Sequence, residues 1–304
     1  MKLPPLRANT GASCPLVIAY GMGVDSTAML VGLAHRGVRP DLILFADTGG
    51  ERPETYAYLP VIQAWLRRVG FPPVQVVRYS LVKPRADGQT YSTLEESCLV
   101  NQTLPSLAMG KKSCSLKWKR GPQDKFVDNW QRAVDCWMAG GQVTKAIGYD
   151  SGAADSKRAW NLTDDRKYHY WYPLRDWGWD RKECKRQIAA EGLPVPPKSA
   201  CFFCPASKPW EISEIVDLHP DLADRIIAIE AAAKPKLDQR RALGLPTTEG
   251  LWRKSVAGMR GATPHPGAMT PYIEEQRKKS LHLNVVDEDS EPTLSSLYRW
   301  ENTR

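Results

Sequence analysis

Residues 16–37 constrain the fold more than any other part of the chain. Residues 16–20 are an apolar run of strand length, and Gly21 and Gly23 follow immediately. The apolar side chains after this loop recur at helical spacing until Gly37, a residue typical of helix ends. A strand, a glycine loop and a helix in this order expose N–H groups at the positive end of the helix dipole, and such a junction binds anions. We therefore expect a phosphate group at this loop.

The next segments repeat this pattern and predict a parallel sheet. Residues 41–46 and 73–79 have the composition of buried strands, with a helix between them that we expect Pro60 to kink or split. Strands that alternate with helices at this spacing form right-handed crossovers, and ligands bind beyond the carboxyl ends of such strands. The loops that begin at Gly21 and Asp47 are therefore predicted to lie on one edge of the sheet.

Residues after 79 are predicted to complete the α/β domain and then to form a mostly helical and irregular extension. Further strands are expected at 145–149 and 168–174, and a helix at 180–192. Residues 210–243 have a helical pattern that is interrupted near His219, and we expect little regular structure from Gly244 onward. The fold class is thus α/β, a Rossmann-like parallel sheet flanked by helices, with a mostly helical and irregular C-terminal extension.

The chain is basic and carries no membrane signal. Its 304 residues include 42 Lys and Arg against 34 Asp and Glu, so the net charge is +8 and the pI is about 9.1. This balance favours an anionic partner such as a nucleotide or a nucleic acid, although a basic surface alone would give the same values. No apolar run approaches the length of a membrane span, and the N-terminus lacks the apolar core of a signal peptide. We therefore expect a cytoplasmic protein without membrane association.

Five motifs, in a fixed order, resemble those of a known enzyme group. Residues 21–27 (GMGVDST) resemble the pyrophosphate loop, usually S-G-G-x-D-S, of the adenine nucleotide alpha hydrolases, or PP-loop ATP pyrophosphatases. Within that superfamily the chain is similar to the phosphoadenylyl-sulfate (PAPS) reductase-like family. The other motifs are DTGGERPETY (47–56), SCSLKWKRGP (113–122), YPLRDW (172–177) with GLP (192–194), and CFFC (201–204).

The resemblance implies an activity and a set of site residues. It implies a Rossmann-like domain of the HUP type at residues 1–210, with an inserted segment at 81–140, followed by the extension at 211–304. The domain would bind ATP and Mg²⁺ and cleave ATP between the α and β phosphates, with Asp25, Ser26 and Asp47 in catalytic roles. Nucleotide binding falls to Tyr20, Gly21, Met22, Gly23, Val24, Asp25, Ser26, Thr27, Thr48 and Gly49, and we add the basic Arg158. Helix capping is the alternative role of Asp25 and Ser26.

The seven cysteines indicate a metal site rather than a disulfide scaffold, because disulfides are rare in cytoplasmic proteins. Cys201 and Cys204 stand where relatives with an iron–sulfur cluster have C-x-x-C. Cys114 and Cys98 would complete four thiolates for a [4Fe–4S] cluster. Zinc would accept the same ligands, and free thiols in a loop are the third alternative.

Three functions remain open at this stage. The first is ATP cleavage to AMP, or an adenylylated product, and pyrophosphate, which relatives associate with sulfur transfer or nucleic-acid modification in mobile-element or CRISPR-associated systems. The second is adenylyl-sulfate reduction with an external thiol, although no cysteine follows Cys204 to serve as the family's nucleophile. The third is a non-catalytic nucleotide-binding accessory, since Gly21 and Met22 replace the usual Ser and Gly. The expected partners are a nucleotide, a nucleic acid or nucleoprotein, and a second copy of the chain in a homodimer.

Overall fold

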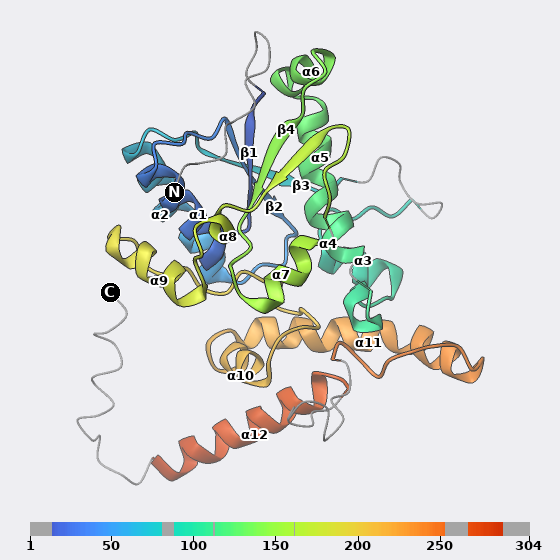
Figure 1. Cartoon of the computed structure of the whole chain (residues 1–304). Helices are drawn as coiled ribbons and strands as arrows, with labels where there is room; N and C mark the ends of the chain where they lie inside the picture. The colour runs from blue at the N-terminus through green and yellow to red at the C-terminus, as the bar shows by residue number, and fades with distance from the viewer. Residues whose placement is uncertain (1–13, 81–87, 112, 161, 253–266, 288–304) are drawn as a thin grey trace. The chain divides into compact units, whose positions relative to one another are not determined.

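The computed structural model describes residues 14–80, 88–111, 113–160, 162–252 and 267–287 (Figure 1). The chain divides into two compact units. The first unit comprises Met1–Val100 and Lys112–Cys201, and the second comprises Asn101–Lys111 and Phe202–Arg304. The division therefore falls within the CFFC motif, a few residues before the boundary at residue 210 that the sequence predicts.

The first unit is built on a five-stranded sheet with the order β3-β2-β1-β4-β5 (Figure 1). Its strands are β1 (Leu16–Tyr20), β2 (Leu42–Asp47), β3 (Val74–Arg78), β4 (Val143–Ile147) and β5 (Tyr168–Trp171). Each neighbouring pair is parallel, and Ile18 of β1 lies opposite Ile43 of β2 and Ala146 of β4. The predicted α/β, Rossmann-like fold is thus confirmed. The strand order reverses at β1 and β4, and this is where such sheets bind ligands.

Helices cover both faces of the sheet because successive strand residues point to opposite sides. Ile18, Ile43 and Phe45 form one core with apolar side chains of α1 (Val24–His35), α2 (Pro53–Arg68) and α9 (Arg181–Ala190). Val17 and Leu44 point the other way and form a second core with α5 (Gly121–Asp128) and α6 (Gln131–Met138). Much of the predicted insertion at 81–140 is therefore a structural layer of the domain.

Several short helices complete the described part of this unit. They are α3 (Leu94–Asn101), which reaches the unit boundary, α4 (Ser113–Ser115), the π-helical turn η2 (Leu116–Arg120), α7 (Ala153–Trp160) and α8 (Pro173–Asp176). Asp180 caps α9 by accepting a hydrogen bond from the Glu183 N–H at 2.8 Å, as the sequence predicts.

The expected split at Pro60 is wrong, because α2 runs without interruption from Pro53 to Arg68 with Pro60 inside it. A proline within a helix costs about 3 kcal/mol. Tyr58, Ile62 and Leu66 are buried on the same face of α2, and burial of each apolar side chain contributes about 1.5–3 kcal/mol. Tertiary packing therefore outweighs the local penalty.

The expectation that the cysteines form no disulfide is also wrong for one pair, since the Sγ atoms of Cys14 and Cys136 are bonded. Cys14 lies just before β1 and Cys136 lies in α6, and the two are 122 residues apart in the sequence. The spacing of these residues carries no signal, because only the fold brings the start of β1 beside α6. Gly141 is required next to the pair, since a Cβ there would lie within 3.2 Å of Cys136 Sγ.

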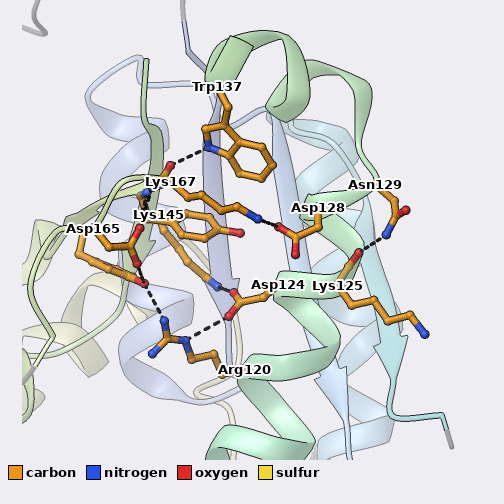
Figure 2. A network of polar contacts seen from close by, with 11 residues as sticks. Arg120, Asp124, Lys125, Asp128, Asn129, Trp137, Lys145, Asp165 and Lys167 are labelled. Carbon is orange, nitrogen blue, oxygen red and sulfur yellow. Dashed lines mark hydrogen bonds and ion pairs between the residues drawn. The ribbon is translucent and has the colours of Figure 1, made fainter. Parts of the chain in front are cut away.

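A polar network joins α5 to the sheet beneath it (Figure 2). Lys145 of β4 has a side chain only 4% exposed, and its Nζ lies 2.6 Å from Asp124 Oδ1. Arg120 contacts the other Asp124 oxygen at 3.1 Å and the Tyr170 hydroxyl at 3.2 Å. Figure 2 also shows a separate ion pair between Lys167 and Asp128, which are both near the surface.

The second unit is helical where it is described, with η1 (Ser106–Met109), α10 (Pro209–Leu218), α11 (Pro220–Ala242) and α12 (Thr270–Asp287). The break near His219 is confirmed, but the expectation of little regular structure after Gly244 is wrong because of α12. Glu230 of α11 is buried and accepts hydrogen bonds from Leu251 N, Met269 N and Thr270 N, so it fixes the start of α12. None of the described helices combines the length and the apolar character that a membrane span requires.

Candidate functional site

The loops after β1 and β4 meet at the carboxyl edge of the sheet, where the strand order reverses. Gly148 follows β4 and lies against the first turn of α1. A Cβ at Gly148 would come within 2.8 Å of the backbone N and Cα of Ser26, so no larger residue fits there without a backbone shift. The two loops are therefore joined backbone to backbone.

Ser26 braces the loop that connects β1 to α1. Its Oγ accepts a hydrogen bond from Gly21 N at 3.2 Å and donates one to Gly23 O at 3.1 Å. The residue that precedes α1 is Gly23, which has no side chain to cap the helix, and Val24 begins the helix. The first N–H groups of a helix have no partner within it, so this end can donate hydrogen bonds to an anion. Asp25 lies inside the helix and is not its N-cap.

Tyr20 and Thr27 are placed beneath the loop. Thr27 has no exposed surface and Tyr20 is 1% exposed, and their hydroxyl oxygens are 3.0 Å apart. This contact fastens α1 to the end of β1. The two buried hydroxyl groups thus support the loop rather than face solvent.

Met22 has φ +60°, which is the left-handed region that favours glycine. The pyrophosphate-loop pattern that residues 21–27 resemble has Gly at this position, and Gly adopts this conformation without strain. The Met22 side chain is 1% exposed and packs in the core with α1. Its burial compensates for the strained backbone.

Three carboxylates gather beside this loop. Asp25 comes from α1, Asp150 from the loop after β4, and Asp155 from α7, and one oxygen of each lies within 4.8 Å of the others. The backbone orders the group, because Asp150 N donates to Asp155 Oδ2 at 3.3 Å and Gly152 N donates to Asp150 Oδ1 at 2.8 Å. The sequence motifs do not include Asp150 or Asp155, which lie in the polar segment DSGAADSKR directly after a strand. That position at a strand end is the signal that could have identified them.

Asp25 is the carboxylate that belongs to the first turn of α1. Its Oδ2 accepts a hydrogen bond from Arg181 Nη1 at 2.6 Å, and its Oδ1 is buried without a hydrogen-bond partner. Burial raises the pKa of the Asp25 carboxyl above its usual value, Arg181 opposes this, and the charges of Asp150 and Asp155 add to it. A positive ion beside Oδ1 would satisfy the buried oxygen and favour the charged carboxylate.

Asp47 lies at the end of β2 and has a different environment. Its Oδ2 accepts two hydrogen bonds from Arg78, at 2.9 and 2.7 Å, and its Oδ1 accepts from the Tyr56 hydroxyl and from Gly49 N, both at 2.8 Å. Four donors saturate this carboxylate, which is 2% exposed. The geometry favours a structural role for Asp47 over the catalytic role that the motifs suggest.

Thr48 and Gly49 are also held within the protein. Gly49 has φ +73°, and a Cβ there would clash with Thr93 at 2.3 Å. Thr48 is 1% exposed, and its Oγ1 lies 3.1 Å from Cys201 Sγ. The predicted nucleotide-binding residues of this loop therefore shape the edge of the site from within.

The basic residues near the motifs have partners of their own. Arg158, which the sequence suggests for nucleotide binding, is 57% exposed and donates to Asp155 Oδ1 at 2.9 Å. It therefore lies at the acidic group, where it can reach an anion after a side-chain rotation. Arg175 donates to Ser156 Oγ at 2.7 Å and so supports α7. The Lys117 ammonium lies over the Tyr79 ring, 4.8 Å from its centroid, so it contacts an aromatic ring rather than one of the three carboxylates.

Three of the four candidate metal-binding cysteines belong to the first unit. Burial raises the pKa of the Cys98 thiol to about 12, and the nearby Cys201 and Cys114 thiols contribute to the shift. Within the described residues, the three carboxylates are the one set of three or more candidate ligand atoms that lie within 4.8 Å of one another. Cys204 belongs to the second unit. Glu51 pairs with Cys201 in an isolated β-bridge. The buried Glu51 carboxylate forms an ion pair with Lys119, with 2.9 Å between Oε1 and Nζ.

The carboxyl edge of the sheet thus brings together a helix N-terminus and three carboxylates. Comparison with known proteins found no family model that matches the chain and no curated protein that is similar to it.

Proposed function

We propose that the chain binds ATP together with a divalent cation at this edge and cleaves the bond between the α and β phosphates. The single observation that carries the proposal is the buried Asp25 Oδ1 without a hydrogen-bond partner, on a carboxylate that is grouped with Asp150 and Asp155 beside a glycine loop at a helix N-terminus. The β1–loop–α1 geometry and the resemblance of residues 21–27 to a pyrophosphate loop support the same assignment.

The donor set fits Mg²⁺. Mg²⁺ prefers carboxylate oxygens and retains several water ligands, and Asp25, Asp150 and Asp155 supply oxygens from three separate segments. When bound, the cation would neutralise phosphate oxygens and so stabilise the charge that develops on the leaving pyrophosphate. The role of the three aspartates is to hold the cation on one side of the phosphate chain.

The loop and α1 supply the second half of the site. N–H donors at the start of α1 point to the same edge as Asp25 and lie at the positive end of the helix dipole. Ser26 and Gly148 fix these donors before any ligand binds, because the loops are joined through backbone contacts. Donors that need no reorganisation stabilise a developing negative charge most effectively.

Two features of the chain indicate which kind of molecule accepts the activated nucleotide. The net charge of +8 supports an anionic acceptor such as a nucleic acid, and Cys98, Cys114 and Cys201 support sulfur chemistry near the end of β2. We therefore propose sulfur transfer or nucleic-acid modification as the setting. An iron–sulfur cluster would use these thiols, with no step of ATP cleavage depending on it.

The direct test is incubation with Mg²⁺ and ATP labelled at the α phosphate. The proposal expects AMP, or an adenylylated product, together with pyrophosphate. Asp25→Asn and Asp155→Asn should lower the rate about a hundredfold or more, because each removes charge from the cation site. Asp128→Asn is the matched control, since Asp128 lies on the opposite face of the sheet and pairs with Lys167.

Other outcomes would point elsewhere. ATP that binds but stays intact would identify a nucleotide-binding accessory protein. Sulfite release from adenylyl sulfate with an added thiol would identify a reductase, although no cysteine after Cys204 is present to carry the sulfur. ADP and phosphate as products would contradict cleavage at the α phosphate.

A further inference from the structure

The two oxygens of Asp25 have different neighbours. Oδ2 is held by Arg181 Nη1 at 2.6 Å, and Oδ1 is buried without a hydrogen-bond partner. One of the two Asp25 oxygens lies within 4.8 Å of oxygens of Asp150 and Asp155. Arg181 is the first residue of α9, and its side chain is 47% exposed. The guanidinium can therefore leave Asp25 by rotation of its own side chain, without any change in the core between α1 and α9.

The charges around Asp25 explain why Arg181 is there. Three carboxylates lie close together, and two guanidinium groups pair with them, Arg181 with Asp25 and Arg158 with Asp155. Arg175 Nη1 also lies 3.5 Å from the Asp150 carbonyl oxygen, so three guanidinium groups accompany the three carboxylates. A divalent ion among the carboxylates would add positive charge there and repel a guanidinium that is hydrogen-bonded to one of them.

A freed guanidinium would find a new partner nearby. Asp25 lies in the first turn of α1, directly after the loop that is proposed to hold phosphates. A guanidinium that leaves Asp25 Oδ2 is therefore already beside that loop. Arginine binds phosphate oxygens through paired N–H donors, and these contacts are stronger than those of a neutral donor.

We propose that Arg181 is a positioning residue that holds Asp25 in the cation-free protein and transfers to the nucleotide phosphate when the divalent cation binds. This inference rests on the proposed function, because it assigns an order of events within the same site. It makes cation and nucleotide binding cooperative, since each ligand favours the arrangement that the other requires. A residue with a purely structural role would not affect the two affinities in opposite directions.

The test measures Mn²⁺ binding by electron paramagnetic resonance, without nucleotide and with α,β-methylene-ATP. Without nucleotide, Arg181→Ala should bind Mn²⁺ about three- to tenfold more tightly, because a competing cation has been removed. With Mn²⁺ present, the same variant should bind the analogue about tenfold more weakly. Arg181→Lys should stay close to the wild type in both measurements, because it keeps the charge.

Arg186→Ala is the matched control. Arg186 lies on the same helix and pairs with Glu183 at the surface, so its removal should leave both affinities unchanged. Arg181→Gln keeps a hydrogen-bond donor for Asp25 and serves as a second variant if the alanine variant is poorly folded.

Unchanged or weaker Mn²⁺ binding by folded Arg181→Ala and Arg181→Gln would overturn the inference. Its failure can be told apart from failure of the proposed function. If Arg181→Ala binds Mn²⁺ more tightly but the wild type never cleaves ATP, the exchange stands and the ATP pyrophosphatase assignment falls. If ATP is cleaved and Arg181→Ala and Arg181→Gln match the wild type in both affinities, the exchange falls and the function stands. A wild type that binds no Mn²⁺ contradicts both.

Discussion

Asp124→Asn should destabilise the first unit strongly, because it leaves the Lys145 ammonium buried and unpaired. The Lys145 side chain is 4% exposed, and among the described residues Asp124 is its ion-pair partner at 2.6 Å. Removal of one partner from a buried ion pair costs about 3–5 kcal/mol. The Asp124 side chain is 25% exposed and Asn keeps an acceptor oxygen, so we expect the lower limit, about 3 kcal/mol. This loss corresponds to a fall in Tm of about 6–12 °C.

Urea unfolding followed by tryptophan fluorescence measures this loss. Asp128→Asn is the control, since the Lys167–Asp128 pair is about half exposed and should contribute about 0–1 kcal/mol. The double variant Lys145→Met/Asp124→Leu should recover most of the stability, because an apolar pair has no charge to desolvate. If Asp124→Asn is no less stable than Asp128→Asn, Lys145 is hydrated in solution and the reasoning fails.

Three further predictions concern stability. The hydrogen bond from His35 at 2.8 Å holds the pKa of the Glu191 carboxyl below its usual range, so Glu191→Gln should lower the Tm at neutral pH. The difference in Tm should disappear as the pH falls below about 4, because Glu191 is then protonated, and a difference that persists in acid would contradict this account. Met22→Gly removes about 1 kcal/mol of backbone strain but also a buried side chain that contributes about 1.5–3 kcal/mol, so the Tm should fall. A Tm above that of the wild type would refute this account of the loop. Cys136→Ser should cost up to about 5 kcal/mol in denaturant unfolding under oxidising conditions, since the bond to Cys14 closes a loop of 122 residues, and no difference is expected in excess reductant.

The sequence predicts the sheet well because its strands are continuous apolar runs between glycine and proline signals. Residues 16–20 and 42–47 are buried on both faces, so neither strand has the ambiguity of an alternating pattern. The prediction fails at Pro60 and at α12, where local composition indicates a break or irregular structure. In both cases buried contacts decide the outcome, through Ile62 in α2 and Ile273 in α12.

The candidate site could be predicted only in part, for a similar reason. Asp25 is visible because it belongs to a contiguous motif. Asp150 and Asp155 meet it only through the sheet topology, which makes β1 and β4 neighbours although they are more than a hundred residues apart. The saturated carboxylate of Asp47 could not be foreseen, because Arg78 reaches it across two neighbouring strands.

The backbone contact at Gly148 has a consequence for the speed of ligand binding. Since Gly148 fits against Ser26 with no space for a side chain, the two loops are ordered when the chain folds, and a ligand has no loop to order on arrival. Association should then follow single-exponential kinetics whose observed rate rises linearly with nucleotide concentration, without the plateau that a slow loop closure would impose.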